Sequence, residues 1–99
     1  MQGIVVRYRY SGEEADWKAA MQDFIDAIGA DEAVSGRFRY VATVAADGVA
    51  RLHMGRWDSE ETLKTVQSRD YFQRFTAAVQ RFAGDTLESV RIEVGPATD

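Results

Sequence analysis

Hydrophobic and polar side chains alternate along four stretches of the chain, which is the pattern of a half-buried β-strand. These stretches cover residues 4–10, 37–44, 49–57 and 86–94. Asp47-Gly48 separates the second stretch from the third. An Asp-Gly pair favours a tight hairpin turn, so we expect these two strands to pair in antiparallel orientation.

One helix is expected between the first two strands. Ser11 and Glu14 form a capping box that predicts its start, and Gly29 predicts its end. Its apolar side chains recur at intervals of three or four residues and so form one stripe, made of Trp17, Met21, Phe24 and Ile28.

A short helix and a longer one are expected between the third and fourth strands. Asp58 and Glu61 form a second capping box, and Ser68 can cap the longer helix, which Gly84 would end. The buried positions of these two helices would be Leu63, Val66, Tyr71 or Phe72, Phe75, Val79 and Phe82.

The expected order of elements is typical of an α+β, ferredoxin-like domain. Such a β-α-β-β-α-α-β chain forms a four-stranded antiparallel sheet with helices on one face. Residues 1–99 are expected to form a single domain of this kind. The strand residues expected to meet the helices are Ile4, Val6, Phe38, Tyr40, Ala42, Val44, Leu52, Met54, Val90, Ile92 and Val94.

The opposite face of the expected sheet would be basic, although the formal net charge of the chain is −4. Arginine donates planar, bidentate hydrogen bonds to oxyanions, so this face could bind an anionic or polyphenolic small molecule. It could instead form ion pairs in a dimer interface, or bind RNA, although residues 51–57 lack the paired stacking aromatics of an RNA-recognition strand. The residues expected there are Arg7, Arg9, Arg37, Arg39, Arg51, Arg91, His53, Thr43, Trp57 and Glu93.

His53 is the only histidine of the chain. With an ordinary pKa near 6.5 it could accept a proton at neutral pH, and nearby arginines would favour its neutral form. It could equally be one polar residue in a wet interface. A metal site is not expected, because no second histidine exists and no carboxylate falls at ligand spacing around it.

Composition excludes several classes of protein. The 99 residues are 45% hydrophobic, as in a globular domain, and include no cysteine, so disulfides, thiolate metal sites and cysteine nucleophiles are ruled out. No apolar run approaches the roughly 20 residues that span a bilayer, and a cytoplasmic location is expected. The negative net charge argues against general binding to nucleic acid or membranes.

The stretch Trp57–Phe75, in which WDSEETLKTVQ leads into SRDYFQRF, resembles the antibiotic biosynthesis monooxygenase family. Proteins of that family are dimeric α/β barrels, in which two ferredoxin-like sheets pack face to face. Members include cofactor-independent oxygenases acting on anthrones or quinols, haem-degrading enzymes and isomerases. The resemblance implies a homodimer with a small-molecule pocket.

Matched by position, Trp57 corresponds to the tryptophan that closes the third strand in this family. His53 stands where the anthrone oxygenases carry a polar amide, and Leu63 stands where they carry a tyrosine. An ungapped match places Thr76 and Val66 where the haem-degrading members have their histidine ligand and a tryptophan. Haem degradation is therefore not expected.

We predict a homodimeric, cofactor-independent monooxygenase-like enzyme that acts on an aromatic or quinol-type small molecule. His53 would be the catalytic residue and would orient or deprotonate a phenolic group. The alternative is a non-catalytic dimeric module that binds a small ligand. The expected substrate-binding residues are Arg7, Arg9, Arg39, Arg51 and Trp57.

Overall fold

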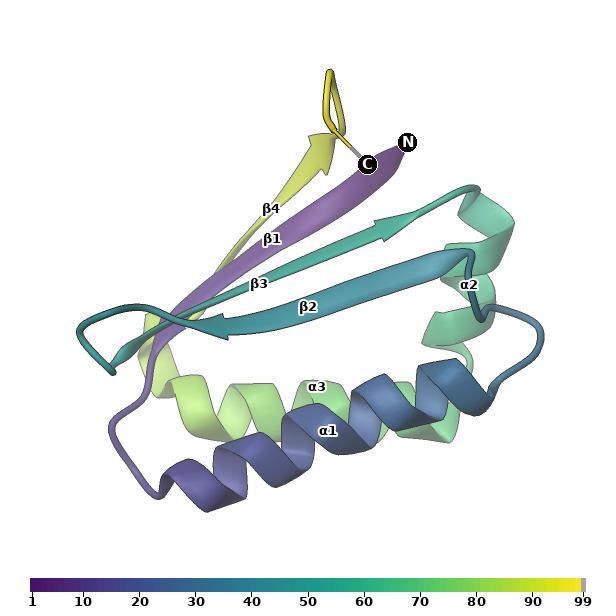
Figure 1. The fold of residues 1–99 in the computed structure, drawn as a ribbon. Coiled ribbons are helices and arrows are strands. Elements are labelled where there is room, and N and C mark those ends of the chain that lie inside the picture. The colour runs from purple at the N-terminus through teal and green to yellow at the C-terminus, as the bar shows by residue number, and fades with distance from the viewer. Residues whose placement is uncertain (99) are drawn as a thin grey trace.

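The computed structural model describes residues 1–98, and its four strands form one antiparallel sheet with the order β2-β3-β1-β4 (Figure 1). Helices α1 and α3 cover one face of this sheet, and α2 lies at its end. The predicted ferredoxin-like fold is confirmed; Asp99, the end of the expected polar tail, lies outside the described residues. The elements are β1 (Gln2–Arg9), α1 (Glu14–Ala30), β2 (Phe38–Val44), β3 (Ala50–Trp57), α2 (Glu60–Gln67), α3 (Asp70–Ala83), the 3-10 turn η1 (Gly84–Thr86) and β4 (Glu88–Glu93).

The start of α1 differs from the expectation. Glu13 is its N-cap and provides no side-chain hydrogen bond, so the predicted capping box is not formed. The carboxylate of Glu14 instead accepts two hydrogen bonds from Arg51, each 2.9 Å long. Gly29 does not end the helix, which continues to its C-cap at Asp31.

The second predicted capping box is not formed, and the N-cap of α2 lies one residue later than expected. Ser59, not Asp58, is the N-cap of α2, and its hydroxyl accepts a hydrogen bond from the backbone N–H of Thr62 at 3.2 Å. Ser68 is the C-cap of α2 rather than the N-cap of α3. Gly84 ends α3 as expected, with a φ of 58° that favours glycine.

The predicted hairpin turn is confirmed. Gly48 has a φ of 76°, and the Asp47 carboxylate accepts hydrogen bonds from the backbone N–H groups of Val49 and Ala50, both at 2.9 Å. The turn pairs β2 with β3 so that Phe38 lies opposite Trp57.

The core fills the space between the sheet and the helices. The expected stripe of α1 is buried throughout, and α3 contributes Phe75, Val79 and Phe82. The inner faces of β1 and β2 also agree with the prediction. Their core residues are Ile4, Val6, Tyr8, Phe38, Tyr40 and Ala42. Within residues 1–98, no helix is long and apolar enough to cross a membrane.

The predicted orientation of β3 is wrong. Val6 pairs directly with His53, and Tyr8 pairs with Arg51. Directly paired residues in an antiparallel sheet point to the same face. Arg51 and His53 therefore face the helices, together with Trp57, whereas Leu52 and Met54 lie on the outer face and are each 40% exposed.

The orientation of β4 is reversed in the same way. Val5 of the outer face pairs with Val90, and Ile4 of the inner face pairs with Arg91. Val90 and Ile92 therefore lie on the outer face, while Arg91 shares the inner face with Trp57. Val94 lies beyond the end of β4.

Arg51 can lie in the interior because its guanidinium is fully paired. It is 2% exposed and donates to the Glu14 carboxylate and to the backbone carbonyls of Tyr10 and Gly48, at 3.1 and 3.0 Å. It also stacks on the Trp17 ring, 4.5 Å from the ring centre. Its hydrogen bonds hold the pKa of the Glu14 carboxyl below its ordinary value. Arg51 thus joins the start of α1 to the β2–β3 hairpin.

Candidate functional site

A cavity of about 200 Å³ lies between α3 and the inner face of the sheet. Apolar side chains line its inner end, and exposed side chains of α2, α3 and β4 line its mouth. The buried lining residues are Phe24, Phe38, Trp57, Leu63, Phe75 and Val79. The exposed ones are Gln67, Gln80, Leu87, Ser89 and Arg91. Apolar walls with a few polar groups are typical of small-molecule sites.

Trp57, which lines this cavity, carries a buried hydrogen-bond donor without a partner. The side chain is 2% exposed, and its ring stacks on Phe38 with ring centres 5.8 Å apart. Among residues 1–98, its indole Nε1 is the one buried side-chain nitrogen or oxygen without a hydrogen bond. Leaving such a group unpaired costs about 1–3 kcal/mol, so an acceptor atom in the cavity would be stabilised there.

Arg91 places a positive charge beside this donor. Its guanidinium lies over the Trp57 ring, 5.1 Å from the ring centre. Because Arg91 pairs with Ile4 and is exposed, it lies on the inner face of β4 at the mouth of the cavity. The alternation pattern placed Arg91, like Trp57, on the outer face of the sheet, and Arg91 was not among the expected substrate-binding residues.

His53 lies in the core and is 0% exposed. Its Nε2 atom is 2.8 Å from the Tyr8 hydroxyl oxygen, and its Nδ1 atom is 2.9 Å from the Tyr40 hydroxyl oxygen. The indole N–H of Trp17 donates to Tyr8 at 2.7 Å. Burial lowers the pKa of His53 to about 4, so the imidazole is neutral at pH 7.

The neutral imidazole must donate one of these hydrogen bonds and accept the other. If Tyr8 donates to Nε2, then Tyr40 accepts from Nδ1–H and keeps its own hydroxyl proton free. In the other tautomer the free proton would belong to Tyr8, which is 3% exposed. An unpaired donor costs more in the core than beside a cavity, so the first arrangement is favoured. Burial raises the pKa of both tyrosines, which are therefore protonated at neutral pH.

The favoured arrangement is a directed chain of hydrogen bonds from Trp17 through Tyr8 and His53 to Tyr40. Tyr40 also lines the cavity, so the chain ends at a residue of the cavity wall. The sequence carried no separate signal for this role, because Tyr40 was expected to be a packing residue like its neighbours on β2.

The predicted site residues do not come together. Trp57 alone of the expected substrate-binding residues lines the cavity. Arg51 is paired with Glu14 inside the protein, and Arg7 and Arg39 lie on the outer face of the sheet with Arg9 at the end of β1. Arg51 does share a face with His53, but it is the inner face; for Arg7, Arg9 and Arg39 the expectation of a face shared with His53 is wrong. No group of three or more metal-ligating side chains is found within residues 1–98.

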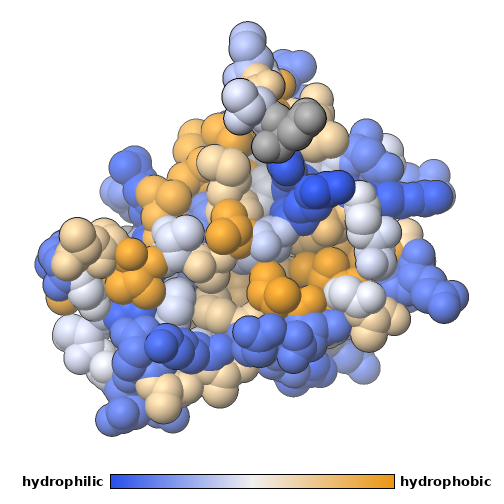
Figure 2. Space-filling model, viewed as in Figure 1, coloured by the Kyte–Doolittle hydropathy of each residue, from blue (hydrophilic) through white to orange (hydrophobic). Residues whose placement is uncertain are grey.

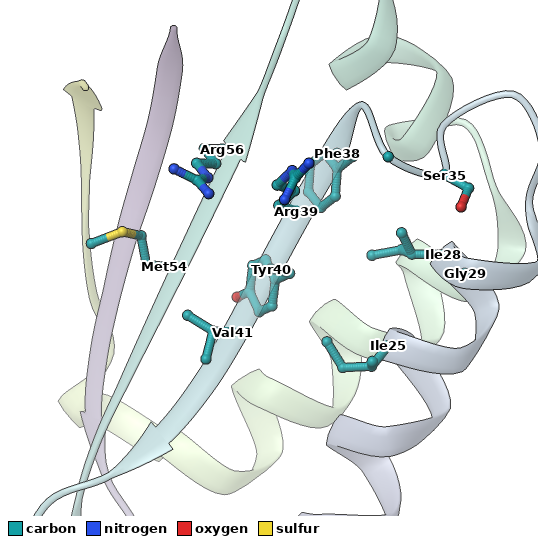
Figure 3. A pocket seen from close by; sticks show the side chains of 11 residues that line it. Ile25, Ile28, Gly29, Ser35, Phe38, Arg39, Tyr40, Val41, Met54 and Arg56 are labelled. Atoms are coloured by element: carbon teal, nitrogen blue, oxygen red, sulfur yellow. The ribbon is translucent and has the colours of Figure 1, made fainter. Parts of the chain in front are cut away.

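A larger groove of about 600 Å³ runs between α1 and the edge strand β2 (Figure 3). It is lined by Tyr40 from the inner face of β2 and by Arg39 and Val41 from the outer face. The groove therefore wraps around the edge of the sheet and is open. Because no unpaired buried polar atom lines it, the cavity at Trp57 is the stronger candidate site.

Comparisons with family models and with curated proteins found no match. Among solved structures, the chain is similar to SnoaB, a cofactor-independent oxygenase from Streptomyces nogalater, with a TM-score of 0.75 and 12% identity over 97% of this chain and 94% of that one. An antibiotic biosynthesis monooxygenase matches with a TM-score of 0.73 and 11% identity, over 97% of this chain and 100% of that one. The chain has the fold of the antibiotic biosynthesis monooxygenases.

A third similar structure is a dimeric ferredoxin-like protein of unknown function from Jannaschia sp. CCS1. It matches with a TM-score of 0.66 and 11% identity, over 95% of this chain and 100% of that one. The resemblance predicted from Trp57–Phe75 is thus confirmed for the fold. At this level of identity the roles of individual residues rest on the geometry of the site itself.

Proposed function

We propose that the protein is a homodimeric, cofactor-independent monooxygenase-like enzyme that acts on an aromatic or quinol-type small molecule in the cavity between α3 and the sheet. The buried, unpaired indole N–H of Trp57 carries this proposal. The rings of Phe38 and Phe75 suit a flat aromatic body, and a carbonyl or phenolic oxygen of that body would accept the N–H. The fold shared with SnoaB supports the class of reaction.

Two donors would favour the anionic form of such a substrate. The indole N–H of Trp57 and the free hydroxyl proton of Tyr40 can both stabilise charge that develops on a substrate oxygen. His53 would act as a positioning residue that holds the Tyr40 hydroxyl in place. This replaces direct deprotonation by His53, which has both ring nitrogens already bonded and no exposed surface.

The substrate itself would supply the electrons for the reaction with oxygen. In a substrate such as an anthrone, the ring CH₂ group loses a proton to water. The resulting anion gives one electron to O₂, and the substrate radical and superoxide then combine to form a carbon–oxygen bond. Protonation gives a hydroperoxide, and loss of one water molecule leaves a carbonyl group. One oxygen atom enters the product and the other leaves as water.

The homodimer in this proposal is supported by the outer face of the sheet. Its exposed apolar side chains are Val41, Leu52, Met54 and Val90, which are 40–56% exposed. Figure 2 shows hydrophobic residues along the sheet above the hydrophilic surface of α1. Exposed apolar patches of this kind mark interaction sites. A second copy packed sheet against sheet would cover the patch.

A non-catalytic dimeric module that binds a small ligand is the second candidate. The burial of His53 favours it, because no histidine of the chain is then free to act on a bound ligand. The two candidates share the same cavity and differ in whether oxygen is consumed.

Oxygen uptake with anthrone and 1,4-naphthohydroquinone tests the proposal, with protein-free autoxidation subtracted. We expect uptake by the wild type and a fall of about 100-fold in kcat for Trp57→Phe, which keeps an aromatic ring and removes the N–H. Arg37→Gln, at an exposed position before β2, is the control and should keep the wild-type rate. Binding without oxygen uptake would support the module instead, and absence of both would exclude either function for this cavity.

A further inference from the structure

The β4 strand forms the open side of the cavity and presents polar groups there. Ser89 pairs with Val6, and Arg91 pairs with Ile4, so both side chains lie on the inner face at the mouth. On this face the cavity therefore changes from buried apolar walls to exposed polar ones.

Arg91 has no acidic partner within the described part of the chain. The three salt bridges among residues 1–98 involve Arg51, Arg69 and Arg74. Glu93, the next residue on the same face of β4, makes no ion pair with Arg91. A guanidinium at the mouth of a cavity is thus left with its N–H groups unused.

The contact with Trp57 holds this guanidinium in a defined place. A cation stacked on an indole keeps its N–H edges free for an acceptor. The face of the indole ring and its N–H edge can then serve different parts of a ligand. The guanidinium of Arg91 stacks on the face of the ring, and the buried N–H on its edge is unpaired.

We propose that the ligand of this cavity is an aromatic acid whose carboxylate binds Arg91 at the mouth. The inference rests on the proposed function, because it requires an aromatic body in the cavity. The planar fork of arginine matches a carboxylate bidentately, and the Ser89 hydroxyl lies on the same face as a further donor. An anion would otherwise be disfavoured near a chain whose formal net charge is −4.

A matched pair of probes tests this inference, namely 2-naphthoate and its neutral analogue 2-naphthamide. Their dissociation constants are measured by isothermal titration calorimetry with the wild type, Arg91→Gln, Arg91→Lys and the control Arg37→Gln, which removes an exposed charge that does not line the cavity. We expect the wild type to bind 2-naphthoate more tightly than 2-naphthamide. Arg91→Gln should weaken 2-naphthoate about tenfold and leave 2-naphthamide unchanged, since one charge-assisted hydrogen-bonded pair is lost.

Arg91→Lys keeps the charge without the planar fork. Its dissociation constant for 2-naphthoate should lie between those of the wild type and Arg91→Gln. Far-UV circular dichroism of each variant establishes that it is folded. If the wild type binds the amide as tightly as the acid, or if Arg91→Gln weakens both probes equally, the carboxylate site is excluded while the cavity remains. If the wild type binds neither probe, the aromatic cavity of the proposed function fails together with this inference.

Discussion

The Nδ1 atom of His53 lies 2.9 Å from the hydroxyl oxygen of Tyr40, and this contact joins the core to the wall of the cavity. On its other side His53 contacts Tyr8, which accepts a hydrogen bond from Trp17 on α1. The histidine is thus one member of a chain of hydrogen bonds that ends at the cavity. Its importance for a ligand would come through the orientation of Tyr40.

Replacing Tyr8 with Phe should destabilise the protein more than replacing Tyr40 with Phe. Tyr8→Phe leaves both the indole N–H of Trp17 and Nε2 of His53 unpaired in the core, whereas Tyr40→Phe leaves only Nδ1 unpaired. At about 1–2 kcal/mol for each unpaired group, the free energy of unfolding should fall by about 3 and about 1.5 kcal/mol respectively. Urea denaturation followed by far-UV circular dichroism measures both, and equal losses would contradict the chain of hydrogen bonds.

Burial of neutral His53 should make the stability depend on pH between about 4 and 6.5. The pKa of His53 is about 4 in the folded protein and has an ordinary value of 6.5. In this window the unfolded chain binds a proton that the folded protein does not, so stability falls as pH decreases. Above pH 6.5 the titration of His53 no longer lowers the stability. By pH 4 it has lowered the free energy of unfolding by about 3 kcal/mol.

The variant His53→Gln separates this effect from the titration of carboxylates. Glutamine can both donate and accept a hydrogen bond, so it can replace the two contacts of the imidazole in part. Its free energy of unfolding should be less dependent on pH than that of the wild type between pH 4 and 6.5. An identical slope in the two proteins would assign the pH dependence to other groups.

The fold could be predicted from the sequence because each element has its own periodic pattern. The faces of β3 and β4 could not be assigned by hydrophobicity, since Leu52 and Met54 suggested the wrong side for the core. The hairpin turn held the missing information. The hairpin loop is centred on Asp47-Gly48 and so places Phe38 opposite Trp57, and paired residues share a face.

The polar residues of the site depend on contacts between segments that are distant in sequence. Arg51 lies in the interior because Glu14, 37 positions away, accepts its hydrogen bonds. His53 is satisfied by Tyr8 across the sheet, 45 positions away. Periodicity along one strand carries no information on such partners, so the sequence favoured an exposed basic face. Burial of charge is tolerated only where these partners exist.

A methyl group added at Gly55 should displace Tyr40 from His53. A Cβ atom at Gly55 would lie 2.9 Å from Cδ1 of the Tyr40 ring, which is closer than packed carbon atoms allow. We expect Gly55→Ala to lower the free energy of unfolding by about 1–3 kcal/mol, as overpacking does. It should also weaken ligand binding, because the Tyr40 hydroxyl moves.

Gly29→Ala is the matched control for this substitution. Gly29 lies inside α1, and a Cβ atom there would meet no atom within 4 Å. Alanine is favoured over glycine in a helix, so this variant should be more stable by about 0.5–1 kcal/mol. Thermal unfolding of both variants gives the comparison, and a loss of stability at both positions would show that the Tyr40 contact is not the cause.

A charge on the outer face of the sheet should separate the proposed dimer. Met54→Glu and Val90→Glu each place a carboxylate in the apolar patch directly opposite Val5, where pairing with a second sheet would bury the charge among apolar side chains. Light scattering coupled to size-exclusion chromatography should give twice the mass of one chain for the wild type and the mass of one chain for each variant. Gln73→Glu adds the same charge at an exposed position of α3, and this variant should remain dimeric. A wild-type mass of one chain at every concentration would exclude the second copy as the partner of this face.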